Sequence, residues 1–228
     1  MRFIGKDPNI IDAYYTATAE GAITVGKPII VEADGDVAQI TGETAGAGSA
    51  ATFESAETYL YERSVVFDSS ANKVVIFYRD SGNSGYGTAV DGTVSNKTIS
   101  FGTPVVFESA SVTTIAASFD TNENKTMVFY RDGGNSNYGT GIVCSVSGTT
   151  PSFGTPVVWL SRTVAFLNSC FTDGFNRHIA VFTDTVGGIG GDGITISGIA
   201  STISGTTPSF GSVKTDLPGD GQGGKAYP

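Results

Sequence analysis

The sequence predicts an all-β protein of about three four-stranded, propeller-like blades with a 52-residue repeat, preceded by a small β segment. Three observations support this prediction. Equivalent residues recur at a fixed spacing, since Lys73, Lys125 and Arg177 lie 52 residues apart. The composition, with 31 glycines among 228 residues and 15% charged residues, suits short strands joined by tight turns. Four short strands in a unit of about 40–50 residues is the pattern of a propeller blade.

The repeat is visible in longer segments as well. The run ISFGTPVVFES from Ile99 returns as PSFGTPVVWLS from Pro151, 52 residues later. A third copy, PSFGSVKTD, starts at Pro208, 57 residues after the second, and the glycine-rich run TVGGIGGDGIT accounts for the additional residues. A partial copy, TFESA from Thr52, stands upstream. We therefore interpret residues 46–216 as one domain of three repeats.

The middle repeat illustrates the expected strands, which are rich in Val, Ile, Phe and Tyr and bounded by turn residues. They are expected at residues 115–119, 126–130, 141–146 and 156–160. The runs DTNEN, RDGGNSNYG and SGTTPSFG separate them. An aromatic residue followed by glycine is expected to mark the same bend before each outer strand. These pairs are Phe101-Gly102, Phe153-Gly154 and Phe210-Gly211.

The two ends of the chain do not carry the repeat. Residues 1–45 are predicted to form an N-terminal β segment with a hairpin, in which a turn at residues 34–36 joins strands at 29–31 and 37–40. The small residues of 42–51 suit a linker. The tail at residues 217–228 contains Pro and Gly without periodicity and is expected to be loosely ordered.

Three blades are fewer than a closed propeller needs, since closed propellers have roughly 4–8 blades. Three blades alone would leave open sheet edges. Several chains could complete a ring together, or the units could stack along a fibre axis. Either arrangement predicts a homo-oligomer.

A repeated Arg-Asp pair provides the candidate ligand-binding loops. VVIFYRDSGNSGYGTAV from Val74 and TMVFYRDGGNSNYGTGIV from Thr126 place the pair at the end of the second strand of a blade. Asp followed by Gly and Asn is typical of turns, so a repeated structural turn is the first interpretation. The third copy keeps Asp184 but has Thr183 in place of the arginine, as a turn allows. The candidate loop residues are Arg79, Asp80, Asn83, Tyr86, Arg131, Asp132, Asn135 and Tyr138.

The sequence argues against an enzyme and against a resident cofactor or metal. The chain has one histidine, His178, at the start of a strand beside Arg177, which would disfavour its charged form. A histidine metal centre is therefore excluded, and a solvent-facing or strand-packed side chain is expected rather than a catalytic base. Glycosidases use two carboxylates at a set separation, but the carboxylates here fall at repeat-equivalent positions, as Asp68 and Asp120 do.

Charge and hydropathy exclude further classes. The formal net charge of −9 argues against a nucleic-acid surface. No apolar run approaches the roughly 20 residues that span a bilayer, and the start lacks the apolar region of a signal peptide. Cys144 and Cys170 are expected to be buried and reduced, with a disulfide or a reactive thiol as the alternative. GGIGGDGIT fits one copy of a calcium-binding nonapeptide, which leaves open an ion held by Asp184 and Asp192.

Three stretches carry a resemblance to a known class of proteins: GKPIIVEADGDVAQITG, NKVVIFYRDSGNSGYGTAV and ISFGTPVVFESASV. They resemble virion structural proteins of tailed bacteriophages, especially marine phages, in which such blade-like repeats occur in long arrays. The resemblance implies a non-enzymatic, oligomeric tail fibre, appendage or capsid decoration component located in the virion. It also implies that residues 1–45 bind other virion proteins. With only three repeats, a compact part is expected rather than a long fibre.

A second resemblance is to small fucose-binding lectins, whose short chains trimerise into a full propeller. Their Trp-rich sugar pockets are absent, since this chain has one tryptophan, Trp159. This resemblance keeps a carbohydrate-binding module as the alternative function, with the repeated Arg-Asp loops meeting a host-surface glycan.

Overall fold

The computed structural model describes residues 18–24, 29–31, 35–39, 48–56, 58, 62–184 and 195–215. The chain divides into two compact units, Met1–Ala47 and Gly48–Pro228. The described residues of both units form β-strands, turns and two short 3-10 turns without an α-helix, which confirms the all-β class. The expected tail at residues 217–228 lies outside the described residues.

The first unit contains a three-stranded sheet with the strand order β1-β3-β2. Strands β2 (Ile29–Val31) and β3 (Val37–Gln39) pair antiparallel, as the hairpin prediction required. Strand β1 (Ala19–Glu20) pairs parallel with β3, which the sequence did not predict. The side chain of Val37 is buried in this small sheet.

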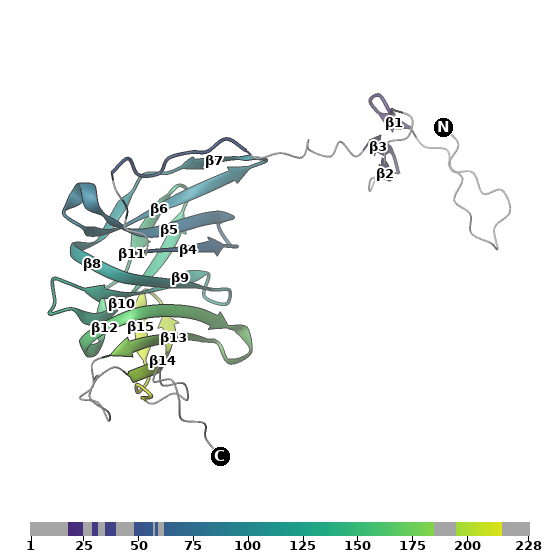
Figure 1. Ribbon diagram of the computed structural model, residues 1–228. Coiled ribbons are helices and arrows are strands. Elements are labelled where there is room, and N and C mark those ends of the chain that lie inside the picture. Colours follow the sequence, from purple (N-terminus) through teal and green to yellow (C-terminus); the bar gives the residue numbers. More distant parts are fainter. Residues whose placement is uncertain are drawn as a thin grey trace, which may run out of the picture. The chain divides into compact units, whose positions relative to one another are not determined.

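The second unit contains one twelve-stranded sheet (Figure 1). Its pairing runs in the order β15-β14-β13-β12-β10-β9-β8-β6-β5-β4, and β7 and β11 pair with β6 and β10. Within residues 62–184 and 195–215 this sheet does not close on itself, because β4 and β15 remain its two ends. The strands are β4 (Arg63–Asp68), β5 (Lys73–Asp80), β6 (Tyr86–Ser95), β7 (Thr98–Phe101), β8 (Val105–Asp120), β9 (Lys125–Asp132), β10 (Tyr138–Ser147), β11 (Thr150–Phe153), β12 (Val157–Thr172), β13 (Arg177–Asp184), β14 (Thr195–Ser204) and β15 (Thr207–Phe210).

The 52-residue repeat appears in this sheet as three successive strand groups. Group 1 consists of β4, β5, β6 and β7 with residues 105–111 of β8. Group 2 consists of residues 112–120 of β8, then β9, β10 and β11, with residues 157–163 of β12. Group 3 consists of residues 164–172 of β12, then β13, β14 and β15. In Figure 1 the groups follow one another in the order of the sequence.

Two long strands each belong to two groups. The first part of β8 pairs with β6 and its second part pairs with β9, and β12 is divided in the same way between β10 and β13. A register shift accompanies each change of partner, and Thr114 and Phe166 there adopt positive φ angles of 53° and 49°. A β-bulge bends its strand and increases the local twist, so it redirects β8 and β12 from one group to the next. The sequence predicted that the last strand of one repeat and the first strand of the next are two separate strands. This prediction is wrong, because β8 and β12 are each continuous.

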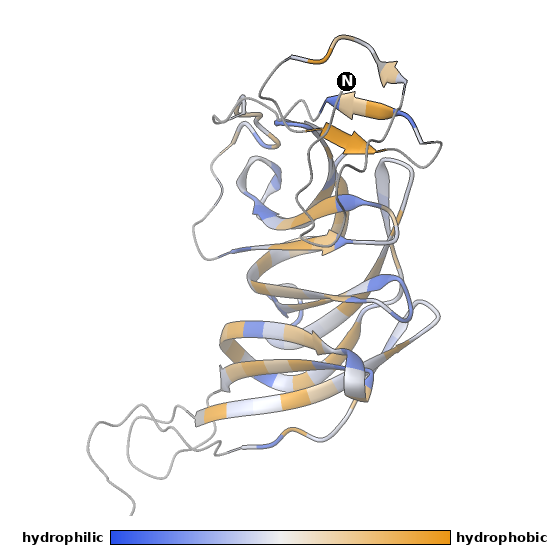
Figure 2. Ribbon diagram, turned by 90° about the vertical axis from the view of Figure 1, so that its right-hand side faces the viewer, coloured by the Kyte–Doolittle hydropathy of each residue, from blue (hydrophilic) through white to orange (hydrophobic). Residues whose placement is uncertain are grey.

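The second strand of group 2 is apolar along most of its length because both of its faces are covered. In β9, Met127 and Phe129 face group 3, whereas Val128 and Tyr130 face group 1. This burial on two faces explains the unbroken apolar runs of the repeat, which would be unusual in a strand with one wet face. Figure 2 shows apolar residues along the strands of all three groups and polar residues gathered at the turns.

Apolar contacts between the groups form the core. The cluster between groups 1 and 2 contains Phe77, Phe107 and Tyr130, and the cluster between groups 2 and 3 contains Phe129, Trp159 and Phe182. Edge-to-face ring pairs fill both interfaces: the Phe107 and Tyr130 centroids are 5.3 Å apart and those of Trp159 and Phe182 are 4.7 Å apart. Such pairs add about 0.5–1.5 kcal/mol each beyond the area that they bury.

The bend that the aromatic–glycine pairs predicted is present in all three groups. Strands β7, β11 and β15 end at the aromatic residue, and the glycine that follows donates its N–H to a carbonyl of the third strand. These hydrogen bonds join Gly102 to Asp91, Gly154 to Val143 and Gly211 to Ala200, at 2.9, 3.0 and 2.9 Å.

Candidate functional site

The candidate loops lie at the turns between the second and third strands of groups 1 and 2. In group 1, Asp80 caps the 3-10 turn Ser81–Asn83, and its Oδ1 accepts the N–H of Asn83 at 3.0 Å. Tyr86 begins β6 directly opposite Asp80 and is half-buried. The hairpin thus brings Asp80, Asn83 and Tyr86 together, with the side chain of Asn83 exposed.

The equivalent loop of group 2 is bonded more extensively. Oδ1 of Asp132 accepts the N–H groups of Gly134 and Asn135 at 2.9 and 3.1 Å, and Asp132 itself is buried. Tyr138 stands opposite Asp132 in the β9–β10 ladder and donates its backbone N–H to the carbonyl of Asn135 at 3.0 Å. The carboxylate serves its own turn, in agreement with the structural interpretation of this motif.

The two arginines differ in their surroundings. Arg79 forms an ion pair with Glu62, with Nη1 and Oε2 2.9 Å apart. Thr114 stands 52 residues after Glu62, so Arg131 lacks the equivalent carboxylate. The Nε atom of Arg131 is buried and has no hydrogen-bond partner among the described residues. The two Arg-Asp loops therefore differ in their polar contacts and do not form the same binding site twice.

The sequence reasoning missed a polar contact beside each loop. The hydroxyl of Tyr130 donates to Oε2 of Glu108 at 3.1 Å, and Tyr78 makes the equivalent bond with Glu54 at 3.4 Å. Burial, followed by the negative charge of Asp132, raises the pKa of Glu108. Group 3 has Phe182 and Leu160 at these positions, so the contact is lost there. The joint recurrence of Tyr and Glu at repeat-equivalent positions was the signal that could have revealed it.

Replacing Asp132 by alanine tests the structural role of the group 2 loop. Two backbone N–H groups of the turn would lose the carboxylate oxygen that accepts them, so we expect the free energy of unfolding to fall by about 1–2 kcal/mol. Chemical denaturation measures this change. Asn135→Ala is the matched control, because the side chain of Asn135 is exposed and its N–H is retained; a change below about 0.5 kcal/mol is expected. Equal stability of the two variants would contradict the assignment.

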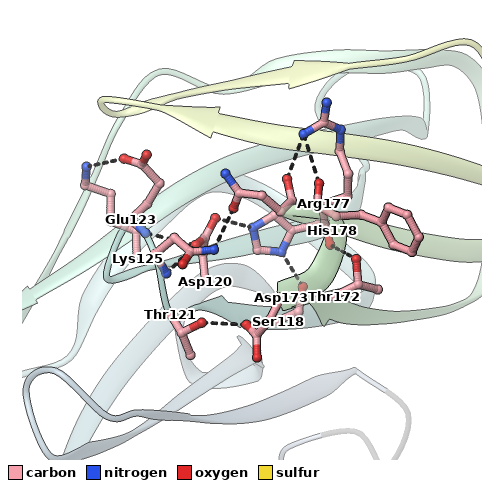
Figure 3. Close-up of polar contacts among 12 residues, drawn as sticks. Ser118, Asp120, Thr121, Glu123, Lys125, Thr172, Asp173, Arg177 and His178 are labelled. Carbon is pink, nitrogen blue, oxygen red and sulfur yellow. Dashed lines mark hydrogen bonds and ion pairs between the residues drawn. The ribbon is translucent and has the colours of Figure 1, made fainter.

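A second polar cluster lies between groups 2 and 3 and includes the single histidine (Figure 3). Strand β8 contributes Ser118 and Asp120, and β13 contributes His178. Oγ of Ser118 lies 2.7 Å from Nδ1 of His178, and Oδ2 of Asp120 lies 3.4 Å from Nε2. All three side chains are buried, and that of His178 is 0% exposed. The expectation of a strand-packed histidine is confirmed.

The environment keeps His178 neutral. Burial lowers its pKa from 6.5 to about 4, and the nearby Asp120 carboxylate opposes this change only in part. The sequence attributed the effect to Arg177, but the guanidinium of Arg177 instead donates to the carbonyls of Phe175 and Asn176 in the β12–β13 turn. Oδ1 of Asp120 accepts two backbone N–H groups of the β8–β9 turn, both at 2.9 Å.

The residue types of this cluster are those of a serine hydrolase, but their arrangement is not. In a hydrolase triad the serine and the carboxylate lie on opposite imidazole nitrogens, with the serine on Nε2 and exposed to substrate. Here the serine lies on Nδ1, the carboxylate lies on Nε2 and the whole cluster is buried. Two further hydrogen bonds join the adjacent turns, from Thr121 to Asp173 at 2.6 Å and from Asn122 to Asn176 at 3.0 Å. The cluster connects two strand groups.

The cysteine and calcium expectations have separate outcomes. Both cysteines are free, and Cys144 is buried, with a pKa that burial raises. Cys170 is exposed, so its expected burial is wrong; it lies on the face of group 3 that no further group covers. Asp192 and most of the glycine-rich run lie outside the described residues. Among the residues that are described, no group of three or more His, Cys, Asp or Glu side chains could hold a metal ion.

Comparisons with models of protein families, with curated proteins and with solved structures find no match to this chain. In the described part of the chain, no helix is long and apolar enough to cross a membrane.

Proposed function

We propose that this chain is a non-enzymatic structural component of a phage virion, a tail appendage or capsid-surface part. Residues 1–45 attach it to other virion proteins, and the repeat domain is displayed. One observation carries the proposal: Asp132, Asp120 and His178, which are buried and capable of acid–base chemistry, are engaged in structural contacts. Asp132 bonds its own turn, and Asp120 and His178 join two strand groups.

The strand groups fit a description as propeller-like blades. Each consists of antiparallel strands, and groups 1 and 2 each pack an aromatic residue of their last strand, Phe107 or Trp159, against the following group. An assembly part needs a rigid body with repeated faces, and this packing supplies one. The small number of groups favours a compact part over a long fibre, and host attachment is an additional role of this proposal.

The alternative function, a carbohydrate-binding module, has less support. The carboxylates of Asp80 and Asp132 are already bonded to backbone N–H groups, and Arg79 is paired with Glu62. The exposed amides of Asn83 and Asn135 and the half-buried Tyr86 and Tyr138 are what remains repeated in both loops. A sugar site usually combines several polar groups with an aromatic platform, and the aromatic residues of the second strands are in the core.

Deletion of residues 1–45 tests the virion assignment. We expect the shortened chain to retain its β-sheet circular dichroism and its cooperative unfolding, because Gly48–Pro228 forms its own compact unit. We expect it to be absent from purified particles, as measured by mass spectrometry. Deletion of residues 217–228 is the control and should leave incorporation unchanged. Incorporation of the chain without residues 1–45 would overturn the proposal.

A further inference from the structure

Residues 48–56 correspond to part of a fourth strand that has no group of its own. They cover group 1 in the way that residues 105–111 cover group 2. The rings of Phe53 and Tyr78 are 5.2 Å apart, against 5.3 Å for Phe107 and Tyr130. Gly48 and Gly102 also occupy equivalent places. Gly48 lies close to a backbone carbonyl of the β6–β7 turn, and Gly102 lies close to a backbone carbonyl of the β10–β11 turn.

One property of this segment departs from the repeat. Residues 105–111 pair with the third strand β6, with Glu108 opposite Gly87 and Val106 opposite Thr88. Residues 48–56 belong to no strand, and the sequence that precedes them does not carry the repeat. Among the described residues, no strand pairs with residues 48–56 in the way that β6 pairs with residues 105–111.

A complementary unpaired strand edge lies at the other end of the repeat domain, in group 3. Strand β14 pairs with β15 through Ser201–Ser204 and is bridged from Gly198 to Lys214. Along the same edge, residues 195–197 have no strand partner among the described residues, although the equivalent residues of β6 pair with β8. After Thr215 the sequence also abandons the repeat, since Asp216 stands where Phe107 would be and Pro218, which lacks an N–H, stands where Ser109 would be.

The two outer faces of the repeat domain are incompletely covered as well. On group 1, the N-side face consists of Val65, Phe67 and Val94, which are 57%, 54% and 53% exposed. Their equivalents in group 2 are Ala117, Phe119 and Val146, and Ala117 and Val146 pack against the cluster between groups 1 and 2. The N-side face therefore keeps the apolar pattern of a covered face.

On group 3, the C-side face consists of Asn168, Ile179 and Val181, and Val181 is 39% exposed. The equivalent residues of group 2 are Ala116, Met127 and Phe129, which are buried under group 3. Asn168 is compatible with the same stacking, because Ser64 occupies this position in group 1 and its Oγ accepts the N–H of Ala117 at 3.0 Å.

We propose that a second copy of this chain stacks head to tail on the first. The N-side face of one copy covers the C-side face of the other, by the same contact that joins groups 1, 2 and 3. Residues 52–56 of one copy then pair with the free edge of residues 195–197 of the other, and Asn168 accepts the backbone N–H of Val65. Head-to-tail contacts are heterologous, so they produce a closed ring or a filament.

Light scattering on single and mixed face variants tests this association. Phe67→Glu blocks the N-side face and Val181→Glu blocks the C-side face, and both side chains are exposed enough for the fold to tolerate a charge. We expect the unchanged chain to form oligomers and each variant alone to have the 23.5 kDa mass of a single chain. An equal mixture of the two variants should give a dimer, because one intact N-side face and one intact C-side face remain. Phe175→Asp, at a turn residue that is 81% exposed, is the control and should still oligomerise.

Several results would overturn the proposal. One is an unchanged chain that stays monomeric at high concentration. Another is an oligomer that persists in Val181→Glu, which would mean that two N-side faces meet head to head. A folded mixture without dimer would equally exclude it; circular dichroism checks the fold of each variant. Particle incorporation is measured separately, so failure here leaves the virion proposal standing.

Discussion

Replacing Gly154 by alanine is expected to lower the free energy of unfolding by about 3 kcal/mol or more. A Cβ atom at this position would lie 1.8 Å from the carbonyl oxygen of Thr206 and 2.8 Å from its carbon. Both are backbone atoms of the β14–β15 turn in the following group, so relief of the clash requires groups 2 and 3 to separate. Urea denaturation monitored by the fluorescence of Trp159, which lies in this interface, measures the loss.

Two matched controls accompany this variant. Gly211→Ala changes the equivalent glycine of group 3, which no further group covers, and its Cβ would meet its nearest atom at an ordinary 3.4 Å. Gly174→Ala places a Cβ in open space. Losses well below 1 kcal/mol are expected for both. A similar loss in Gly154→Ala and Gly211→Ala would contradict the close contact between groups.

Acidification from pH 6.5 to pH 4 is expected to remove about 3 kcal/mol of stability through His178 alone. In the unfolded chain this imidazole binds a proton with its ordinary pKa of 6.5, whereas burial lowers its pKa in the folded chain to about 4. Between these values the unfolded state binds the additional proton, so stability falls as the pH falls. Below pH 4 both states are protonated and the loss is complete.

The measurement compares the pH dependence of unfolding in the natural chain and in His178→Thr. Threonine is the matched choice, because Thr126 occupies the equivalent position of group 2. The difference between the two profiles isolates His178 from carboxylates such as Glu108, whose raised pKa acts in the opposite direction. Since the chain has one histidine, NMR can follow its titration directly. Parallel profiles, or a pKa near 6.5 in the folded chain, would show that the imidazole is not buried as described.

Local features of the fold were predictable from the sequence, whereas features that depend on contacts between the groups were not. The strand periodicity, the bend after Phe153 and the turn bonds of Asp132 follow from neighbouring residues. The continuity of β8 did not, because the small and mostly polar residues of 109–114 conceal a strand that changes partners at a bulge. Parallel pairing of β1 with β3 was equally hidden, since a two-residue strand carries no periodic signal.

The same distinction applies to the candidate site. Asp80 and Asp132 were assigned correctly to turns because an Asx turn is encoded within four residues. The contact of His178 with Asp120 joins residues 58 positions apart and depends on how two groups stack. In the sequence, this contact was indicated only by the replacement of Thr126 by His178 at the equivalent position of the next repeat.

The sharing of β8 and β12 between neighbouring groups has a consequence for the cooperativity of folding. In repeat proteins each repeat contacts only its neighbours, so the stability is approximately a sum of repeat and interface terms and folding can start at any repeat. Here one continuous strand supplies backbone hydrogen bonds to two groups, its first part to one and its second part to the next, so the end of one group is the start of its neighbour. Neighbouring groups are thereby coupled through a shared strand as well as through apolar contacts, and we expect the domain to unfold as a single unit.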